Sequence, residues 1–285
     1  MFGHDTNKSF TCLRLCLLFY TICSVFDINQ KHELQKNLSD YIINLVLLVI
    51  PMQGGASDSV VMPQVVILAG GLGTRLGELT QKMPKSLVEV YDKPIIEHIL
   101  DWISGQGCDR ALILTGHLGE QFKHYTHPSV SLTFVQEDQP LGTGGALWNA
   151  VDFLEQEFIL LWGDDFHPIN YQKLVSRHRE DGNLMTMTVT ESHESMNLRH
   201  MDGKVMHYDK HQLSPDFNGY EAGTSVVSKR IVLLFGRDGK WSWEETVYPK
   251  MSGKIGAHLD DTKFWDMGTP ERLSKLTEFL KSEGA

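Results

Sequence analysis

Short apolar runs alternate with stretches of helical periodicity from residue 64 onward. The runs are rich in Val, Ile and Leu and are typical of buried strands, which we expect at residues 65–68, 111–114, 130–135 and 158–162. Between them the spacing of apolar residues predicts helices at residues 94–105, 120–125 and 144–153. This rhythm is typical of a mainly parallel sheet that binds its ligands at the carboxyl ends of the strands.

The pattern changes after Asp165. Further strands are expected at residues 184–189, 205–208 and 224–227, separated by turns, so that the sheet is mixed. A last helix is predicted over residues 270–280, with Thr269 as its N-cap. The fold class is therefore α/β, a mainly parallel mixed sheet flanked by helices.

Residues 1–60 have a different pattern. Two apolar runs, residues 15–26 and 41–50, are each shorter than the about 20 residues that span a bilayer. We expect residues 1–60 to be an N-terminal extension outside the catalytic fold and residues 61–285 to form one domain. A membrane anchor and an over-extended start are the alternatives for the extension.

Charge and cysteine usage narrow the class of protein. The 285 residues carry 26 basic and 36 acidic side chains, a formal net charge of −10, which disfavours nucleic acid as a partner. An anionic ligand must then be met by local cations, for which Arg75, Lys85 and Lys210 are candidates. Only Cys108 lies beyond the extension, so no disulfide framework is expected and a cytoplasmic location is predicted. The thirteen histidines, His167 among them, show no zinc spacing and are expected on the surface or in loops.

A glycine-rich loop follows the first expected strand over residues 68–77. Glycines let the backbone come close to a ligand and direct N–H groups at it, while Arg75 and Lys85 add positive charge. Together they indicate a polyphosphate site. The loop is not a Walker loop, because no Lys follows its last glycine, and it misses the dinucleotide fingerprint by one residue. An ordinary strand-to-helix turn is the remaining alternative.

Gly-Gly-x-Gly-Thr-Arg-Leu at residues 70–76, with Pro-Lys at residues 84–85, resembles the signature of the sugar-1-phosphate nucleotidylyltransferases. The resemblance extends over residues 63–280 and includes a second glycine loop, residues 140–146, which in that family lies over the nucleotide base. It implies the Rossmann-like fold of the nucleotide-diphospho-sugar transferases. The nucleotide-binding residues that it implies are Leu68, Ala69, Gly70, Gly71, Gly73, Thr74, Glu137, Gly142 and Thr143.

Two acidic residues are the metal ligands that the resemblance implies. Asp164 follows an apolar strand in Gly-Asp-Asp, and Asp266 lies in Trp-x-Asp-x-Gly-Thr-Pro. A carboxylate at the end of a strand beside a polyphosphate is a natural Mg²⁺ ligand, so Mg²⁺ is the expected cofactor. The role of Asp165 is open. Solvated acids at a turn and a helix-capping loop are the structural alternatives.

Five residues resemble the family's contacts to the sugar phosphate, namely Asp209, Lys210, Glu221, Gly223 and Glu244. The chain departs from the family at two of them, because Asp209 stands where Glu is found and Glu221 where Asn is usual. These departures leave the sugar contact open, and a purely structural role is an equal alternative for each motif.

Glu137 is expected just after the strand that ends at Val135. By resemblance this position faces the Watson–Crick edge of the base. Guanine presents two adjacent donors there, which an ionised carboxylate accepts in a bidentate manner, whereas a pyrimidine carbonyl would meet an unpaired acceptor. Glu137 therefore favours GTP, and the guanylyltransferases that the chain resembles use mannose or heptose phosphates. A solvated loop acid is the alternative.

The reaction that the resemblance implies is NTP + sugar 1-phosphate → NDP-sugar + pyrophosphate. Its nucleophile is already anionic, so catalysis rests on positioning and charge neutralisation. Arg75 is expected to hold the leaving pyrophosphate, Lys85 to stabilise the α-phosphorus and Lys210 to dock the incoming phosphate. The expected partners are an NTP and a sugar 1-phosphate, and a homo-oligomer is open.

Other assignments stay open at this point. Within the family they are uridylyl, thymidylyl or cytidylyl transfer to another sugar phosphate or to phosphocholine. Outside it they are an NADP-binding oxidoreductase, which would need no Mg²⁺, and a non-catalytic nucleotide-binding module. The presence of Arg75, Lys85, Asp164 and Asp266 argues against the non-catalytic module.

Overall fold

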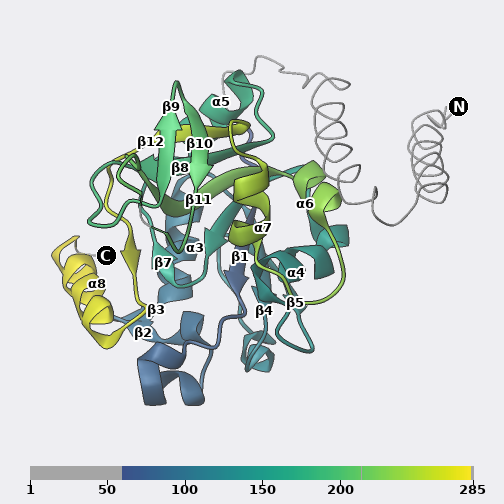
Figure 1. The fold of residues 1–285 in the computed structure, drawn as a ribbon. Coiled ribbons are helices and arrows are strands. Elements are labelled where there is room, and N and C mark those ends of the chain that lie inside the picture. Colours follow the sequence, from purple (N-terminus) through teal and green to yellow (C-terminus); the bar gives the residue numbers. More distant parts are fainter. Residues whose placement is uncertain (1–59, 213, 284–285) are drawn as a thin grey trace, which may run out of the picture. The chain divides into compact units, whose positions relative to one another are not determined.

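The computed structural model describes residues 60–212 and 214–283, which belong to one compact unit. The expected extension, residues 1–60, lies outside the described residues apart from Val60. Nine strands form the central sheet: β1 Gln64–Ala69, β4 Arg110–Thr115, β5 Ser131–Gln136, β6 Glu157–Trp162, β8 Met185–Thr190, β9 Leu198–Met201, β10 Lys204–Tyr208, β11 Tyr220–Ser228 and β12 Ile255–Leu259. Their order across the sheet is β5-β4-β1-β6-β11-β8-β12-β10-β9 (Figure 1).

The strands β5, β4, β1 and β6 are all parallel. Val65 of β1 lies between Ala111 of β4 and Ile159 of β6, and the register continues without a shift. Their carboxyl ends therefore meet at one edge of the sheet. β11 runs antiparallel to both β6 and β8, and here the sheet becomes mixed. The expected fold class is confirmed.

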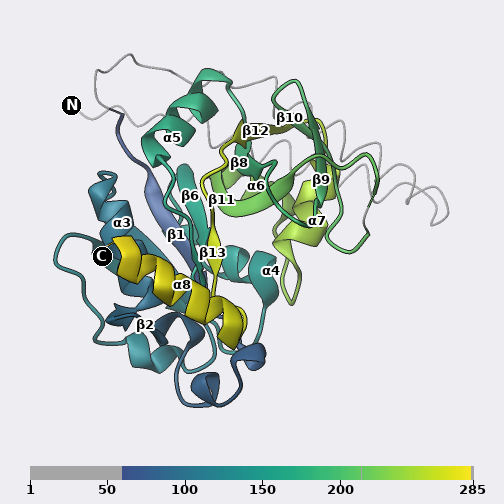
Figure 2. The same cartoon turned by 90° about the vertical axis from the view of Figure 1, so that its left-hand side faces the viewer.

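Helices cover both faces of the sheet (Figures 1 and 2). On one face lie α3, α5 and α8, which share a hydrophobic core with β1. On the other face α4 contacts both α6 and α7. The helices are α3 Ile95–Gly105, α4 Gly142–Asn149, α5 Tyr171–Glu180, α6 Lys229–Phe235, α7 Trp243–Lys250 and α8 Pro270–Glu283. Single turns of 3₁₀ helix are η2 Lys85–Leu87, η3 Gly119–Phe122 and η4 Val151–Phe153, and a longer one is η1 Thr74–Gln81.

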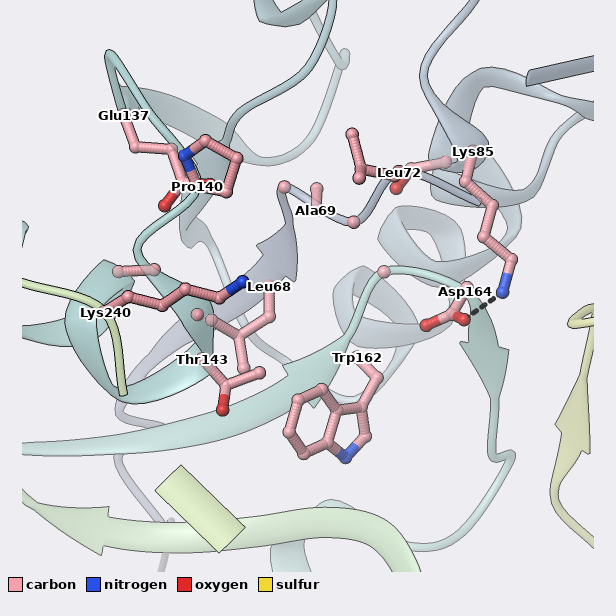
Figure 3. Close-up of a pocket in the computed structure, with 16 residues that line it drawn as sticks. Leu68, Ala69, Leu72, Lys85, Glu137, Pro140, Thr143, Trp162, Asp164 and Lys240 are labelled. Atoms are coloured by element: carbon pink, nitrogen blue, oxygen red, sulfur yellow. Dashed lines mark hydrogen bonds and ion pairs between the residues drawn. The ribbon is translucent and has the colours of Figure 1, made fainter. Parts of the chain in front are cut away.

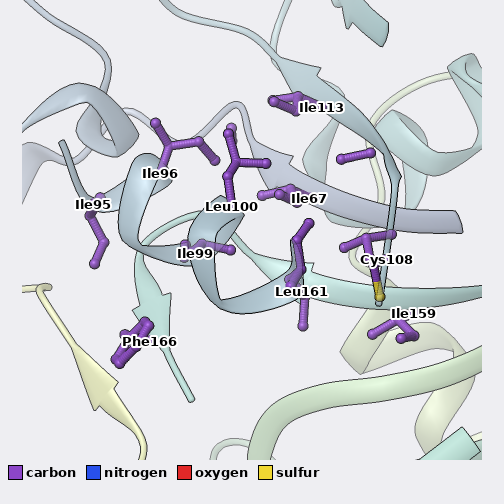
Figure 4. Close-up of a cluster of buried hydrophobic side chains, with 14 of the residues drawn as sticks. Ile67, Ile95, Ile96, Ile99, Leu100, Cys108, Ile113, Ile159, Leu161 and Phe166 are labelled. Atoms are coloured by element: carbon purple, nitrogen blue, oxygen red, sulfur yellow. The ribbon is translucent and has the colours of Figure 1, made fainter. Parts of the chain in front are cut away.

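The largest hydrophobic core lies between α3 and the parallel strands. Figure 4 shows Ile99 and Leu100 of α3 beside Ile67 of β1 and Leu161 of β6, all of them buried. Every residue of β1 is buried, because helices cover both of its faces. Burying one such aliphatic side chain contributes about 1.5–3 kcal/mol. The core therefore fixes β1 firmly, and the loop that follows β1 starts from a rigid point.

Two small two-stranded antiparallel sheets lie beside the central sheet. The strands β2 Glu89–Val90 and β3 Lys93–Pro94 pair with each other, as do β7 Asp165–Phe166 and β13 Trp265–Asp266. The second pair joins the loop after β6 to a segment that precedes α8. It thereby brings two acidic regions together that are far apart in the sequence.

The predicted elements are found, with differences at their ends. The helix expected at residues 144–153 begins earlier, at Gly142, and gives way to the 3₁₀ turn η4 after Asn149. Residues 120–125 form only the 3₁₀ turn η3. The N-cap role of Thr269 is confirmed, since its hydroxyl accepts from the Arg272 N–H at 3.3 Å. Within the described part of the chain, no helix has both the length and the apolar character needed to cross a membrane.

Replacing Gly163 by Ala is expected to destabilise the fold by about 1–3 kcal/mol. A Cβ atom there would lie 2.8 Å from Ser86 Oγ and 3.0 Å from the Leu68 carbonyl oxygen, both within the packed base of the loop. Urea denaturation monitored by tryptophan fluorescence measures the change. Gly71→Ala is the matched control, because a Cβ at Gly71 meets nothing within 4 Å. Equal unfolding free energies for the two variants would contradict the packing argument.

Candidate active site

A pocket of about 240 Å³ opens at the carboxyl ends of β1, β5 and β6 (Figure 3). Backbone hydrogen bonds place its loops side by side. The Gly163 N–H donates to the Leu68 carbonyl at 2.9 Å, and the Glu137 N–H donates to the Thr115 carbonyl at 2.9 Å. The pocket is lined by residues that the sequence had marked as site residues, namely Leu68, Ala69, Gly70, Gly71, Lys85, Glu137, Gly142, Thr143 and Asp164.

Glu137 lies at one end of the pocket. Its Oε2 accepts from the Leu141 N–H at 3.1 Å, and its Oε1 is so close to Gly116 that a Cβ there would approach to 2.8 Å. Burial raises the pKa of Glu137 above its usual value, while the Leu141 hydrogen bond and the charge of Lys240 oppose that shift. The carboxylate is therefore held in one place at the wall of the pocket.

The second glycine loop is shaped by Trp241. The Gly144 N–H donates to the Trp241 carbonyl at 3.0 Å, and the Trp241 N–H donates to the Leu141 carbonyl at 2.9 Å. A Cβ at Gly144 would lie 2.1 Å from the Trp241 ring. Gly142 has φ +71°, which a side chain rarely adopts, and its own Cβ position is 2.6 Å from the Trp241 carbonyl oxygen. These glycines are thus required by packing as well as by any ligand.

Lys85 and Asp164 lie at the other end of the pocket. The Lys85 ammonium forms an ion pair with the Asp164 carboxylate, and Lys85 is buried (Figure 3). The Asp164 carbonyl accepts from the Met267 N–H at 3.1 Å, and Asp165 pairs with Asp266 in the antiparallel pair of strands β7 and β13. This pairing brings Asp164 and Asp266 into neighbouring positions, although sequence spacing alone could not pair them.

Negative charge is concentrated around the paired strands β7 and β13. Burial raises the pKa of Asp165 well above its usual value, and the charges of Asp164 and Asp266 raise it further. The Asp266 carboxylate accepts from Arg272 Nη1 at 2.9 and 3.0 Å and from the Gly268 N–H at 2.8 Å. The positive charges of Lys85, from η2, and Arg272, from α8, thus offset the charges of Asp164 and Asp266.

A divalent cation fits these acids. Mg²⁺ binds in proteins through one or two carboxylates, and waters and substrate phosphates complete its octahedron. The Asp164 and Asp266 carboxylates could provide such a pair of oxygen ligands beside the pocket. Within residues 60–212 and 214–283 there is no cluster of three or more His, Cys, Asp or Glu side chains that could hold a metal unaided. Waters and the phosphates of a substrate would supply the remaining ligands.

The residues of the first glycine loop differ in how they lie relative to the pocket. Arg75 does not line the pocket; its guanidinium lies beside Gly268, where a Cβ would be 3.1 Å from Nη2, and thus on the Asp266 side. Gly73 has φ +60° and packs against Thr80, so its role in this structure is to shape the loop. Thr74 is exposed and opens η1.

A second group of predicted residues surrounds Glu244, which is 7% exposed. Glu244 accepts from Thr143 Oγ1 at 2.6 Å and from Lys210 Nζ at 2.8 Å. Hydrogen bonds from Lys210 and Thr143 lower the pKa of Glu244 against the opposing effect of its burial. Burial, followed by the charge of Glu244, raises the pKa of Glu221 to about 7. Since Thr143 also lines the pocket, this group adjoins the pocket directly.

Gly223 and Asp209 have different surroundings. Gly223 has φ +77° and packs against Trp162 and Asp165, to which a Cβ would come within 3.0 and 3.2 Å. Trp162 lines the pocket, so Gly223 lies just behind its wall. The Asp209 carboxylate instead accepts from the N–H groups of the two residues that follow Lys210, at 2.8 and 2.9 Å, and it is not part of the Glu244 group. In this structure Asp209 stabilises a turn.

His167 lies in the loop after β7, in line with the expected surface or loop position, but it is buried. His167 is 4% exposed, between β11 and the segment before β13. Its Nε2 donates to the Thr262 carbonyl at 3.0 Å, because a carbonyl only accepts, and its Nδ1 lies 3.2 Å from the Thr224 hydroxyl. Burial lowers the pKa of His167 to about 4. No apolar periodicity surrounds His167 in the sequence from which its burial could have been inferred.

Seven residues that line the pocket were not among the predicted site residues: Leu72, Ser86, Pro140, Ala146, Trp162, Gly163 and Lys240. All of them except Lys240 lie within or beside the recognised motifs and could have been found by extending them. Lys240 comes from the segment before α7, and no motif marks it. Only the packing of Trp241 on the second glycine loop brings it here.

Comparison with known proteins gives a consistent result. A model of the nucleotidyl transferase family matches residues 64–199. The D-glycero-alpha-D-manno-heptose 1-phosphate guanylyltransferase of Campylobacter jejuni is 30% identical over 216 residues, which are 73% of this chain and 96% of that protein. The UTP–glucose-1-phosphate uridylyltransferase AglF of Haloferax volcanii is 35% identical over 121 residues, 41% of this chain and 50% of that protein.

Solved structures agree with the sequence relatives. HddC from Yersinia pseudotuberculosis has a TM-score of 0.66 with 28% identity, and the match covers 77% of this chain and all of that one. The same protein has been solved in complex with GMP-PN, with the same TM-score.

His167→Gln is expected to reduce the loss of stability in acid. A buried histidine whose pKa is about 4 must stay neutral in the folded state, so its contribution is present above pH 6.5 and is lost as the pH falls toward 4, approaching about 3 kcal/mol. Thermal unfolding between pH 7 and pH 4 measures the slope. His211→Gln, at an exposed site, is the control. A wild-type slope in the His167 variant would refute this account.

Proposed function

Because the chain belongs to the sugar-1-phosphate nucleotidylyltransferase family, we propose that it transfers a guanylyl group from GTP to a manno-configured sugar 1-phosphate and releases pyrophosphate. Family membership gives the class of reaction, nucleotidyl transfer to a sugar 1-phosphate. The nucleotide, the sugar and the roles of the individual residues are our proposal.

The position of Glu137 is the observation that carries the choice of nucleotide. Its carboxylate is fixed at the end of the pocket formed by the second glycine loop, where the base is expected. Guanine offers N1–H and N2–H₂ side by side, and a carboxylate accepts both. Uracil and thymine place a carbonyl oxygen opposite the second carboxylate oxygen, which costs about 1–3 kcal/mol when no donor is available. A heptose 1-phosphate guanylyltransferase among the relatives supports the same choice.

The opposite end of the pocket suits the phosphates. Lys85 lines the pocket, and we assign it to the α-phosphate; Arg75, on the Asp266 side, is assigned to the departing pyrophosphate. Asp164 and Asp266 would hold Mg²⁺, which when bound supplies positive charge to the phosphate oxygens. In the ligand-free chain each of these two acids forms an ion pair, Asp164 with Lys85 and Asp266 with Arg272.

The Glu244 group suits the acceptor. The Lys210 side chain is 45% exposed, so its ammonium is accessible to the phosphate of a sugar 1-phosphate. Glu221, Glu244 and the backbone at Gly223 are assigned to the sugar hydroxyls. The hydrogen bond from Thr143 to Glu244 joins the wall of the nucleotide pocket to this group. The nucleotide and the sugar 1-phosphate would thus lie on opposite sides of the hydrogen bond between Thr143 and Glu244.

In the proposed reaction the main task of the protein is to position the substrates. The attacking phosphate oxygen carries its own negative charge, so no side chain has to remove a proton. Attack on the α-phosphorus forms one P–O bond and breaks the bond to pyrophosphate, and the cationic residues stabilise the charge that develops on the phosphate oxygens.

GTP is expected to exceed UTP and dTTP in kcat/KM by at least about tenfold, which corresponds to one lost buried hydrogen bond. Glu137→Gln should reduce that ratio, because an amide matches the donor and acceptor of a pyrimidine edge. Pyrophosphate release with mannose 1-phosphate and with a manno-heptose 1-phosphate as acceptors measures both. A wild-type preference for UTP, dTTP or CTP would overturn the guanylyl assignment.

Asp164→Asn and Asp266→Asn should each lower Mg²⁺-dependent pyrophosphate release by about 10²-fold or more, since each removes a charged ligand and retains the side-chain shape. Titration of activity against Mg²⁺ concentration, with circular dichroism to verify folding, measures the effect. Asp202→Asn, in the exposed β9–β10 turn, is the control. Folded variants of Asp164 and Asp266 with normal turnover would remove the metal assignment.

A further inference from the structure

Lys240 is a cation of the nucleotide pocket for which the proposed chemistry has no role. It lines the pocket, and Figure 3 shows its side chain extending across the pocket toward Leu68. Within residues 60–212 and 214–283, no carboxylate lies within ion-pairing distance of its ammonium. Lys85 and Lys210, by contrast, are each paired with an acid. Lys240 is therefore available to a ligand.

The backbone around Lys240 is fixed in place. Its neighbour Trp241 exchanges hydrogen bonds with the second glycine loop, donating to the Leu141 carbonyl at 2.9 Å and accepting from the Gly144 N–H at 3.0 Å. The Trp243 N–H donates to Thr143 Oγ1 at 2.8 Å. Lys240 is thus carried on the same rigid loop that forms the pocket wall, and only its side chain has freedom to move.

Lys240 lies at the end of the pocket that holds Glu137. Its positive charge acts on Glu137, and Figure 3 shows both side chains on the side of Pro140, away from the Lys85–Asp164 pair. Lys85 is at the opposite end, where the phosphates are assigned. The two ends of the pocket thus each hold one lysine and one acid, but only the Lys85–Asp164 pair forms a direct contact.

We propose that Lys240 donates a hydrogen bond to O6 of guanine while Glu137 accepts from N1–H and N2–H₂. This inference rests on the proposed use of GTP and adds a second residue that determines base specificity. O6 is the acceptor adjacent to N1–H on the Watson–Crick edge. Adenine and cytosine present an amino group in that place. An amino group and an ammonium are both donors and cannot form a hydrogen bond with each other. Lys240 therefore excludes adenine and cytosine, just as Glu137 excludes uracil and thymine.

Nucleotide binding tests the proposal without any sugar phosphate. Isothermal titration calorimetry in Mg²⁺ compares GTP, UTP, ITP, which lacks the N2 amine, and 6-thio-GTP, in which a weakly accepting sulfur replaces O6. The proteins are the wild type, Lys240→Met, Lys240→Arg and the control Lys281→Met, at an exposed lysine of α8. Methionine keeps the length of the side chain and removes its charge.

The wild type is expected to bind GTP about tenfold more tightly than 6-thio-GTP, in keeping with one charged hydrogen bond. In Lys240→Met the two affinities should become equal within about twofold, whereas Lys240→Arg and Lys281→Met keep the difference. The ratio of GTP to ITP affinity reports the Glu137 contact and should be the same in all four proteins.

Three results would overturn the proposal. If Lys240→Met weakens GTP, ITP and 6-thio-GTP by the same factor, the lysine contacts a phosphate. If Lys240→Met still rejects 6-thio-GTP, the rejection comes from the size of the sulfur. If the wild type binds UTP as tightly as GTP, the guanylyl assignment itself fails, and this outcome is recognised from the wild type alone, whatever the variants do.

Discussion

The parallel register of β5, β4, β1 and β6 is the constraint on which the site depends. It places the carboxyl ends of these strands at one edge, and the hydrogen bonds from Gly163 to Leu68 and from Glu137 to Thr115 continue the ladder into the loops. The side chains of Glu137 and Asp164 therefore leave the sheet from fixed points. A shift of one residue would turn each of these side chains to the opposite face. The buried core beneath β1 makes such a shift costly.

Charge balance is the second condition that shapes the site. In a chain of net charge −10, the pocket and its surroundings hold Lys85, Lys210 and Arg272 against Asp164, Glu244 and Asp266, each cation beside one acid. Each of these three acids is paired with one cation, whereas Asp165, buried beside Asp164 and Asp266, has a raised pKa. The arrangement suits an anionic substrate and a divalent cation entering together. Each then meets the opposite charge, and no isolated charge stays buried.

Much of the fold and half of the site could be predicted from the sequence, for a physical reason. Buried parallel strands are nearly all apolar, and glycine loops have spacings that few structures share, so β1, β6 and the first loop were found directly. The paired strands β7 and β13 have only two residues each, which is too short for a recognisable pattern of apolar residues in the sequence. Burial of His167 and the inward position of Lys240 arise from contacts with distant segments, which no local periodicity reports.

The second glycine loop and α7 form one packed assembly, and this joins the pocket to the Glu244 group. Trp241 fills the space that Gly144 leaves, Thr143 bonds to both Trp243 and Glu244, and Glu244 in turn bonds to Lys210. A side chain larger than hydrogen at Gly144 would displace Trp241 and with it the start of α7. The glycines of residues 142–145 are therefore explained by protein packing alone.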